Sequence, residues 1–211
     1  MNRYRVLGGL ALAVAGVAFF VGQVVVQSAW TTPFSWADNN ISDLGMVSCG
    51  TWGDPARYVC SPWHPLMNAV FVVNGVLIAI GVVLGLRGRA ARGLLLAAAV
   101  GCVLVGYAPA DVDENLHVLG AVLVFLLGNA GMIAARSVTR GPRWLPVLFG
   151  VVGLVATGLH LSKQGLGLGV AGMERLALFP LFVWFVIEGV LIVRDARRRI
   201  PSDRADAAGV A

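Results

Sequence analysis

Six long apolar runs constrain this chain more than any other feature of its sequence. They lie at residues 6–27, 65–86, 93–108, 116–135, 145–161 and 176–193. An α-helix needs about 20 apolar residues to cross the hydrocarbon layer of a bilayer, and most of these runs approach that length. Backbone groups inside lipid must be satisfied within the segment, so helices are the expected form of such runs. The sequence therefore predicts an all-α fold, a six-helix transmembrane bundle.

Composition also favours lipid as the solvent. Of the 211 residues, 58% are hydrophobic and only 13% are charged, whereas soluble domains carry about 25% charged residues. A globule this apolar would expose patches that associate in water. We expect residues 1–193 to form a single membrane domain and residues 194–211 to form a charged, disordered tail. The net charge of +5 does not indicate nucleic-acid binding, and the expected partner is the lipid bilayer.

The charged residues alternate between successive loops. Thirteen of the 16 Lys and Arg residues lie at the N-terminus, in 87–92, in 136–143 or in the tail. Seven of the 11 acids lie in the other loops. Because cytoplasmic loops are enriched in Lys and Arg, we expect both termini in the cytoplasm, a long first extracytoplasmic loop, and a place in the cell membrane.

The three cysteines divide into a pair and a single residue. Cys49 and Cys60 share the first loop, and Cys102 lies inside the third run. A loop outside the cell faces an oxidising compartment, which favours a Cys49–Cys60 disulfide over metal binding by the pair. We interpret Cys102 as a small buried apolar residue.

All three histidines, His64, His117 and His160, map to the predicted outer side. Three histidines and a carboxylate at similar depth would suit zinc, and such a metal could activate water against a lipid ester or amide. Asp113 precedes His117 by four residues, a spacing that lets both share one helix face. Histidines at helix ends that simply meet headgroups are the competing interpretation. We therefore predict no cofactor, with zinc as the alternative.

Glu188 is the acid that lies inside a run on the predicted cytoplasmic half. An ionisable group within a span is a functional candidate, here for a proton path. The alternative is that Glu188 reaches toward Arg194 and its basic neighbours at the helix end.

Three short motifs follow the apolar runs in order. They are Asn-Asn-Ile-Ser-Asp-Leu-Gly at Asn39 to Gly45, Gly106-Tyr107-Ala108-Pro109 before His117, and Gly172-Met173-Glu174-Arg175 with Pro180 and Trp184 downstream. In this order they resemble the bacterial and archaeal membrane proteins grouped as domain of unknown function 998, over about residues 6–193. The resemblance implies six helices with the motifs on one membrane face, and it supplies no reaction.

The resemblance and the outer polar residues together define a candidate outer-face site. Its residues are Asn40, Ser42, Asp43, Asp113, His117, Glu174 and Arg175. His64 and His160 match no motif of the family. Asn, Ser and Asp also cap helices and close turns, so the Asn39 to Gly45 stretch is either a structural cap or a binding loop.

Three functions stay open at this point. The first is a non-enzymatic protein whose outer site binds a lipid headgroup or a small molecule. The second is an intramembrane, metal-dependent hydrolase acting on lipid, with His117 as a metal ligand or base and Asp43 as its partner. The third is a small proton-coupled transporter that uses Glu188.

Overall fold

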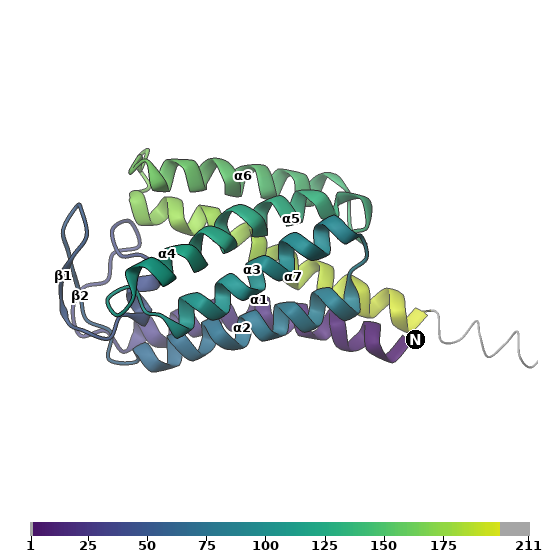
Figure 1. Ribbon diagram of the computed structural model, residues 1–211, viewed down its shortest axis with the longest axis horizontal. Coiled ribbons are helices and arrows are strands. Elements are labelled where there is room, and N and C mark those ends of the chain that lie inside the picture. Colours follow the sequence, from purple (N-terminus) through teal and green to yellow (C-terminus); the bar gives the residue numbers. More distant parts are fainter. Residues whose placement is uncertain (1, 199–211) are drawn as a thin grey trace, which may run out of the picture.

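The computed structural model describes residues 2–198, and within them six apolar helices are long enough to cross a membrane (Figure 1). Five of these spans are the single helices α1 (Asn2–Ser28), α2 (His64–Gly85), α3 (Arg89–Tyr107), α6 (Trp144–Leu161) and α7 (Val170–Arg198). The fourth span is built from α4 (Glu114–Val122), the π-helix η2 (Leu123–Gly128), α5 (Asn129–Ala134) and the short 3-10 helix η3 (Ala135–Ser137). The predicted six-span, mostly helical membrane fold is confirmed.

The last span is longer than its apolar run predicts. It was expected at 176–193, but α7 extends from Val170 to Arg198. Residues 194–198, expected to belong to a disordered tail, are therefore helical. Asp195 explains part of the extension, because its carboxylate lies 3.5 Å from Arg5 and 3.1 Å from Arg140. The rest of the predicted tail, residues 199–211, lies outside the described residues.

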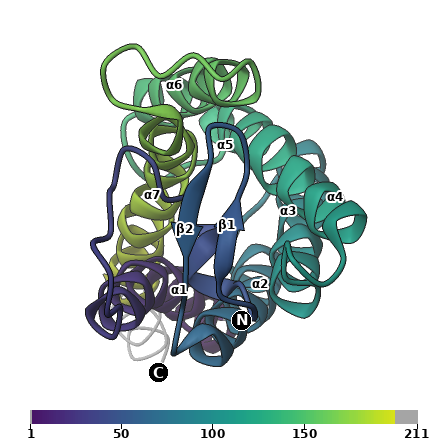
Figure 2. The ribbon, with the colours of Figure 1, turned by 90° about the vertical axis from the view of Figure 1, so that its left-hand side faces the viewer.

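The helices form a closed ring of neighbours. α1 packs against α2 and α7, α2 against α3, and α3 against the fourth span, while α6 packs mainly against α5 and α7. Figure 2 looks along the bundle and shows α4 and α6 separated on the outside of this ring.

Close helix packing explains part of the glycine content. Gly120 of α4 faces Gly101 of α3, and a Cβ on Gly120 would lie 2.8 Å from the Gly101 carbonyl oxygen. Small residues at such crossings let helix backbones approach in lipid, where apolar burial alone gives little drive for association.

The first loop, residues 29–63, has secondary structure of its own. It carries the 3-10 helix η1 (Ser42–Gly45) and an antiparallel hairpin of β1 (Gly50–Trp52) and β2 (Arg57–Val59). A disulfide joins Cys49 to Cys60 immediately outside the paired strands. The hairpin lies across one end of the bundle, which we call the hairpin end (Figures 1 and 2). Sequence analysis did not predict these strands.

Candidate functional site

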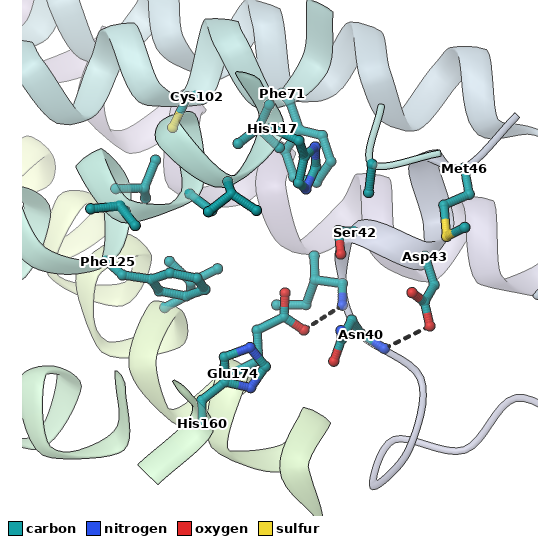
Figure 3. A pocket seen from close by; sticks show the side chains of 18 of the residues that line it. Asn40, Ser42, Asp43, Met46, Phe71, Cys102, His117, Phe125, His160 and Glu174 are labelled. Carbon is teal, nitrogen blue, oxygen red and sulfur yellow. Dashed lines mark hydrogen bonds between the residues drawn. The ribbon is translucent and has the colours of Figure 1, made fainter. Parts of the chain in front are cut away.

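A cavity of about 330 Å³ lies inside the hairpin end of the bundle (Figure 3). Its walls come from the first loop, α4 with η2, the end of α6 and the first half of α7, with single contributions from α1 and α2 and two from α3. The apolar lining deeper in the bundle includes Phe71, Cys102, Phe125, Leu178 and Phe182. Polar residues gather toward the loop, namely Asn40, Ser42, Asp43, Arg57, Glu114, His117, His160 and Glu174.

Asp43 anchors the first loop above this cavity. Its side chain is fully buried and accepts hydrogen bonds from Nε and Nη2 of Arg57, both at 2.6 Å. Its Oδ2 also accepts the backbone N–H of Asn40 at 2.9 Å. The hydrogen bonding to Asp43 raises the pKa of Arg57 above its ordinary value, so Arg57 stays charged. Asp43 thereby joins η1 to β2.

The Asn-Asn-Ile-Ser stretch before Asp43 has both structural and cavity-facing members. Asn39 is buried, and its side-chain oxygen accepts the backbone N–H of Ser35 at 3.0 Å. Asn40 and Ser42 line the cavity instead. Asn39 therefore has a structural contact within the loop, whereas for Asn40 and Ser42 the binding-loop interpretation stays a prediction.

Glu174 connects α7 to this loop. Its Oε2 accepts the backbone N–H of Ile41 at 2.6 Å, and the residue is almost fully buried. Figure 3 shows the other carboxylate oxygen directed into the cavity. One oxygen therefore holds the loop, and the other is available to a ligand.

His160 approaches the same side of the cavity from α6. Its Nδ1 lies 2.9 Å from the carbonyl oxygen of Val170. Because a carbonyl can only accept, Nδ1 carries a proton, and in the neutral ring Nε2 is then an acceptor. His160 is also close enough to Glu174 for the two to interact electrostatically.

His117 faces them from α4, across the cavity (Figure 3). Its Nδ1 donates to the carbonyl oxygen of Ala108 at 2.8 Å, and the ring is buried. This hydrogen bond ties α4 to the end of α3, directly before Pro109. As with His160, it leaves Nε2 as an acceptor.

Two predicted site residues do not line the cavity. Asp113 caps α4, where its carboxylate accepts the backbone N–H of Leu116 at 3.0 Å. Arg175 points away from Glu174, since consecutive helix residues are about 100° apart. Its Nη1 donates to three carbonyl oxygens, those of Trp36, Asn39 and Ala171. Its guanidinium also lies over the rings of Phe34 and Trp36.

The three histidines do not lie around one site. His64 lies at the start of α2, where its Nδ1 is 3.0 Å from the Ser61 carbonyl oxygen, and it is not part of the cavity lining. Within residues 2–198, no three His, Cys, Asp or Glu side chains lie close enough together to hold a metal ion. The zinc hypothesis therefore depends on His117 and His160 without His64.

Glu188 lies at the opposite end of the bundle from the cavity. Its carboxylate accepts Oγ1–H of Thr139 at 2.6 Å and the backbone N–H of Arg140 at 2.8 Å. These contacts hold the loop between η3 and α6 against α7. They are the contacts of a structural anchor.

Arg57 is the site residue that sequence reasoning missed. A signal was present, because it is the only Lys or Arg residue between 28 and 63, within the loop that carries Asp43. Cys102 was interpreted as a buried apolar residue, and it is buried, but it also lines the cavity.

Fold and cavity define a multi-pass membrane protein with a partly polar chamber at one end of a six-helix bundle. The family described as protein of unknown function (DUF998) matches residues 13–191. The chain therefore belongs to the DUF998 family, as its motifs suggested. No curated protein and no solved structure matched it.

Proposed function

We propose that this protein binds the polar end of an amphipathic molecule, such as a membrane lipid, in the cavity under the first loop. The observation that carries the proposal is the division of one cavity into a polar part and an apolar part. Its volume of about 330 Å³ is at the lower end of the range for small-molecule sites. That size suits a headgroup and the first part of a chain.

The proposal includes an orientation in the cell membrane. The basic loops lie at the end opposite the hairpin, and basic loops favour the cytoplasm. Both termini would then be cytoplasmic, and the hairpin end would face outward. The Cys49–Cys60 disulfide supports this direction, since disulfides persist in oxidising compartments.

Filling the cavity tests this function. Ala121 lines the cavity and Ala130 does not, although both are half-buried on the fourth span. Native mass spectrometry of protein released from nanodiscs of bacterial polar lipids should show one retained lipid on the wild type. Ala121→Phe should lose that lipid and Ala130→Phe should keep it. Equal retention by the two variants, or no retained lipid on the wild type, would count against the proposal.

One observation favours hydrolysis as a second candidate. Two imidazoles and a carboxyl group line a single cavity, and such groups serve as general bases, while imidazole is also a zinc ligand. The test is metal analysis of protein purified with added zinc, together with release of fatty acid from ester lipids. Stoichiometric zinc lost in His117→Ala and His160→Ala would support hydrolysis. Folded protein with neither zinc nor ester cleavage would exclude it.

A further inference from the structure

Three side chains in the cavity lining offer hydrogen-bond acceptors to a ligand. His117 and His160 each use Nδ1–H on a backbone carbonyl, which leaves Nε2 as an acceptor in the neutral ring. Glu174 uses one oxygen on the Ile41 N–H and directs the other into the cavity. A ligand that satisfies all three must itself supply donors, because unpaired polar groups in a desolvated site are costly.

The charged residues of the cavity lining also disfavour an anionic ligand. Among the described residues that line the cavity, Arg57 is the only Lys or Arg, and two of its N–H groups are committed to Asp43. Glu114 and Glu174 add two further carboxylates to the lining. A phosphate group would meet these carboxyl groups, and the one arginine of the described lining is already paired with Asp43.

We infer that the ligand carries a primary ammonium head on an aliphatic chain. An ammonium group offers several donors and one positive charge, and a lining with three carboxyl groups and one arginine already paired with Asp43 favours that charge. This inference rests on the proposed binding function and specifies its ligand class. Long-chain amines and amino lipids share this chemistry.

The aliphatic chain has a path into the bilayer between α4 and α6. Val118 of α4 and Leu161 of α6 both line the cavity, yet they are 50% and 60% exposed on the bundle surface. Because α6 packs mainly against α5 and α7, α4 and α6 are not close neighbours, and at Val118 and Leu161 the cavity lining reaches the bundle surface. The amine would lie near Glu174, and the chain would leave past Val118 and Leu161.

Matched photoreactive probes test the head chemistry. Three probes share a twelve-carbon chain with a diazirine, and they end in ammonium, hydroxyl or phosphate. Protein in phosphatidylcholine nanodiscs is irradiated with each probe, and the labelled peptides are mapped by mass spectrometry. The ammonium probe should label α4 and α6 about tenfold more than the hydroxyl probe, the difference expected for one charge-assisted hydrogen bond. The phosphate probe should label least.

A conservative variant connects this preference to Glu174. Glu174→Gln keeps an oxygen for the Ile41 N–H, so the loop contact is retained while the charge is lost. Labelling by the ammonium probe should fall about tenfold, and labelling by the hydroxyl probe should change little. Asp38→Asn, which removes an exposed carboxylate outside the cavity, is the control and should leave both signals unchanged.

A matched pair of variants tests the path of the ligand's aliphatic chain. Val118 and the next residue, Leu119, are 50% and 51% exposed, but only Val118 lines the cavity. Val118→Trp should abolish labelling of the cavity segments, and Leu119→Trp should not. Equal labelling in both would overturn the path between α4 and α6.

The experimental outcomes distinguish the inference of an ammonium head from the proposed binding function. Cavity labelling that is strongest with phosphate, or unaffected by Glu174→Gln, would overturn the ammonium head and leave lipid binding intact. If no probe labels the cavity segments and Ala121→Phe also changes no lipid retention, the proposed function itself fails.

Discussion

At the scale of single residues, the site separates side chains that build the chamber from side chains that face its interior. Asp43 and the Nδ1 atoms of both cavity histidines are used within the protein. The remaining Nε2 atoms and one Glu174 oxygen face the space where a ligand would bind. The same residues thus shape the chamber and leave it rich in acceptors.

Asp43→Asn should loosen the first loop by about 2 kcal/mol, since charged hydrogen bonds contribute about 1.5–3 kcal/mol each and Asn keeps one acceptor. Arg57 is the only Lys or Arg in this loop, so trypsin reports its release directly. Cleavage after Arg57 should become faster in Asp43→Asn. Asp38→Asn, which removes an exposed carboxylate that contacts Ser35, is the control. Trypsin should cleave this variant at the wild-type rate. Unchanged cleavage in Asp43→Asn would contradict an anchoring role.

The chemistry of the site residues was predictable from sequence, whereas their partners were not. Asp43, His117 and Glu174 were singled out because they lie in or directly after family-like motifs on the predicted outer side. Arg57 was missed because only the fold brings β2 onto η1. Glu174 and Arg175 were grouped because they share one motif, but a helix directs adjacent side chains in different directions.

At the scale of elements, hydropathy predicts where spans lie but not where polar contacts extend or interrupt them. Length and apolar content were sufficient for six helices. The extension of α7 depends on Asp195 meeting Arg5 and Arg140, residues distant in sequence. The hairpin is too short to show an alternating pattern, and η2 has the same apolar composition as the α-helices beside it.

The α3–α4 crossing should tolerate no side chain at Gly120. Gly120→Ala places its Cβ 2.8 Å from the Gly101 carbonyl, and forced backbone shifts of this kind cost about 1–3 kcal/mol. Gly93 lies in α3, as Gly101 does, and a Cβ there would have open space, with nothing within 4 Å. Gly93→Ala should therefore keep or slightly raise the unfolding temperature, because Ala favours helix. Thermal unfolding in detergent measures both, and equal melting temperatures would refute the tight crossing.

Acid should release the hairpin from the α6–α7 loop. Lys163 Nζ lies 2.8 Å from Asp54 Oδ2, and this hydrogen bond lowers the pKa of Asp54 below its ordinary 3.8. A lowered folded-state pKa means that the contact stabilises above pH 3.8 and is lost as pH falls through the lowered value. Both groups are exposed, so the effect is small. Protection of the hairpin amides, measured relative to their intrinsic exchange rate at each pH, should fall on acidification in the wild type and show no such step in Lys163→Met.

At the scale of the whole molecule, the bundle is asymmetric from end to end. The hairpin end carries the disulfide, the cavity and its acceptors, whereas the opposite end carries the basic loops and the Glu188 anchor. A ligand site at one end of a ring of helices, open sideways to lipid, suits recognition from the bilayer. Which compartment the hairpin end faces decides whether that ligand comes from the outer leaflet.

Cysteine labelling in intact cells determines that direction. Val112, between α3 and α4, is exposed at the hairpin end, and Ala90 is exposed at the start of α3, beside the basic loop at the other end. Cys102 is buried and Cys49 is bonded to Cys60, so a membrane-impermeant maleimide should react with the introduced thiol. Val112→Cys should be labelled in intact cells, and Ala90→Cys only after permeabilisation, because basic loops are retained in the cytoplasm. The reverse pattern would place the cavity on the cytoplasmic side and assign its ligand to the inner leaflet.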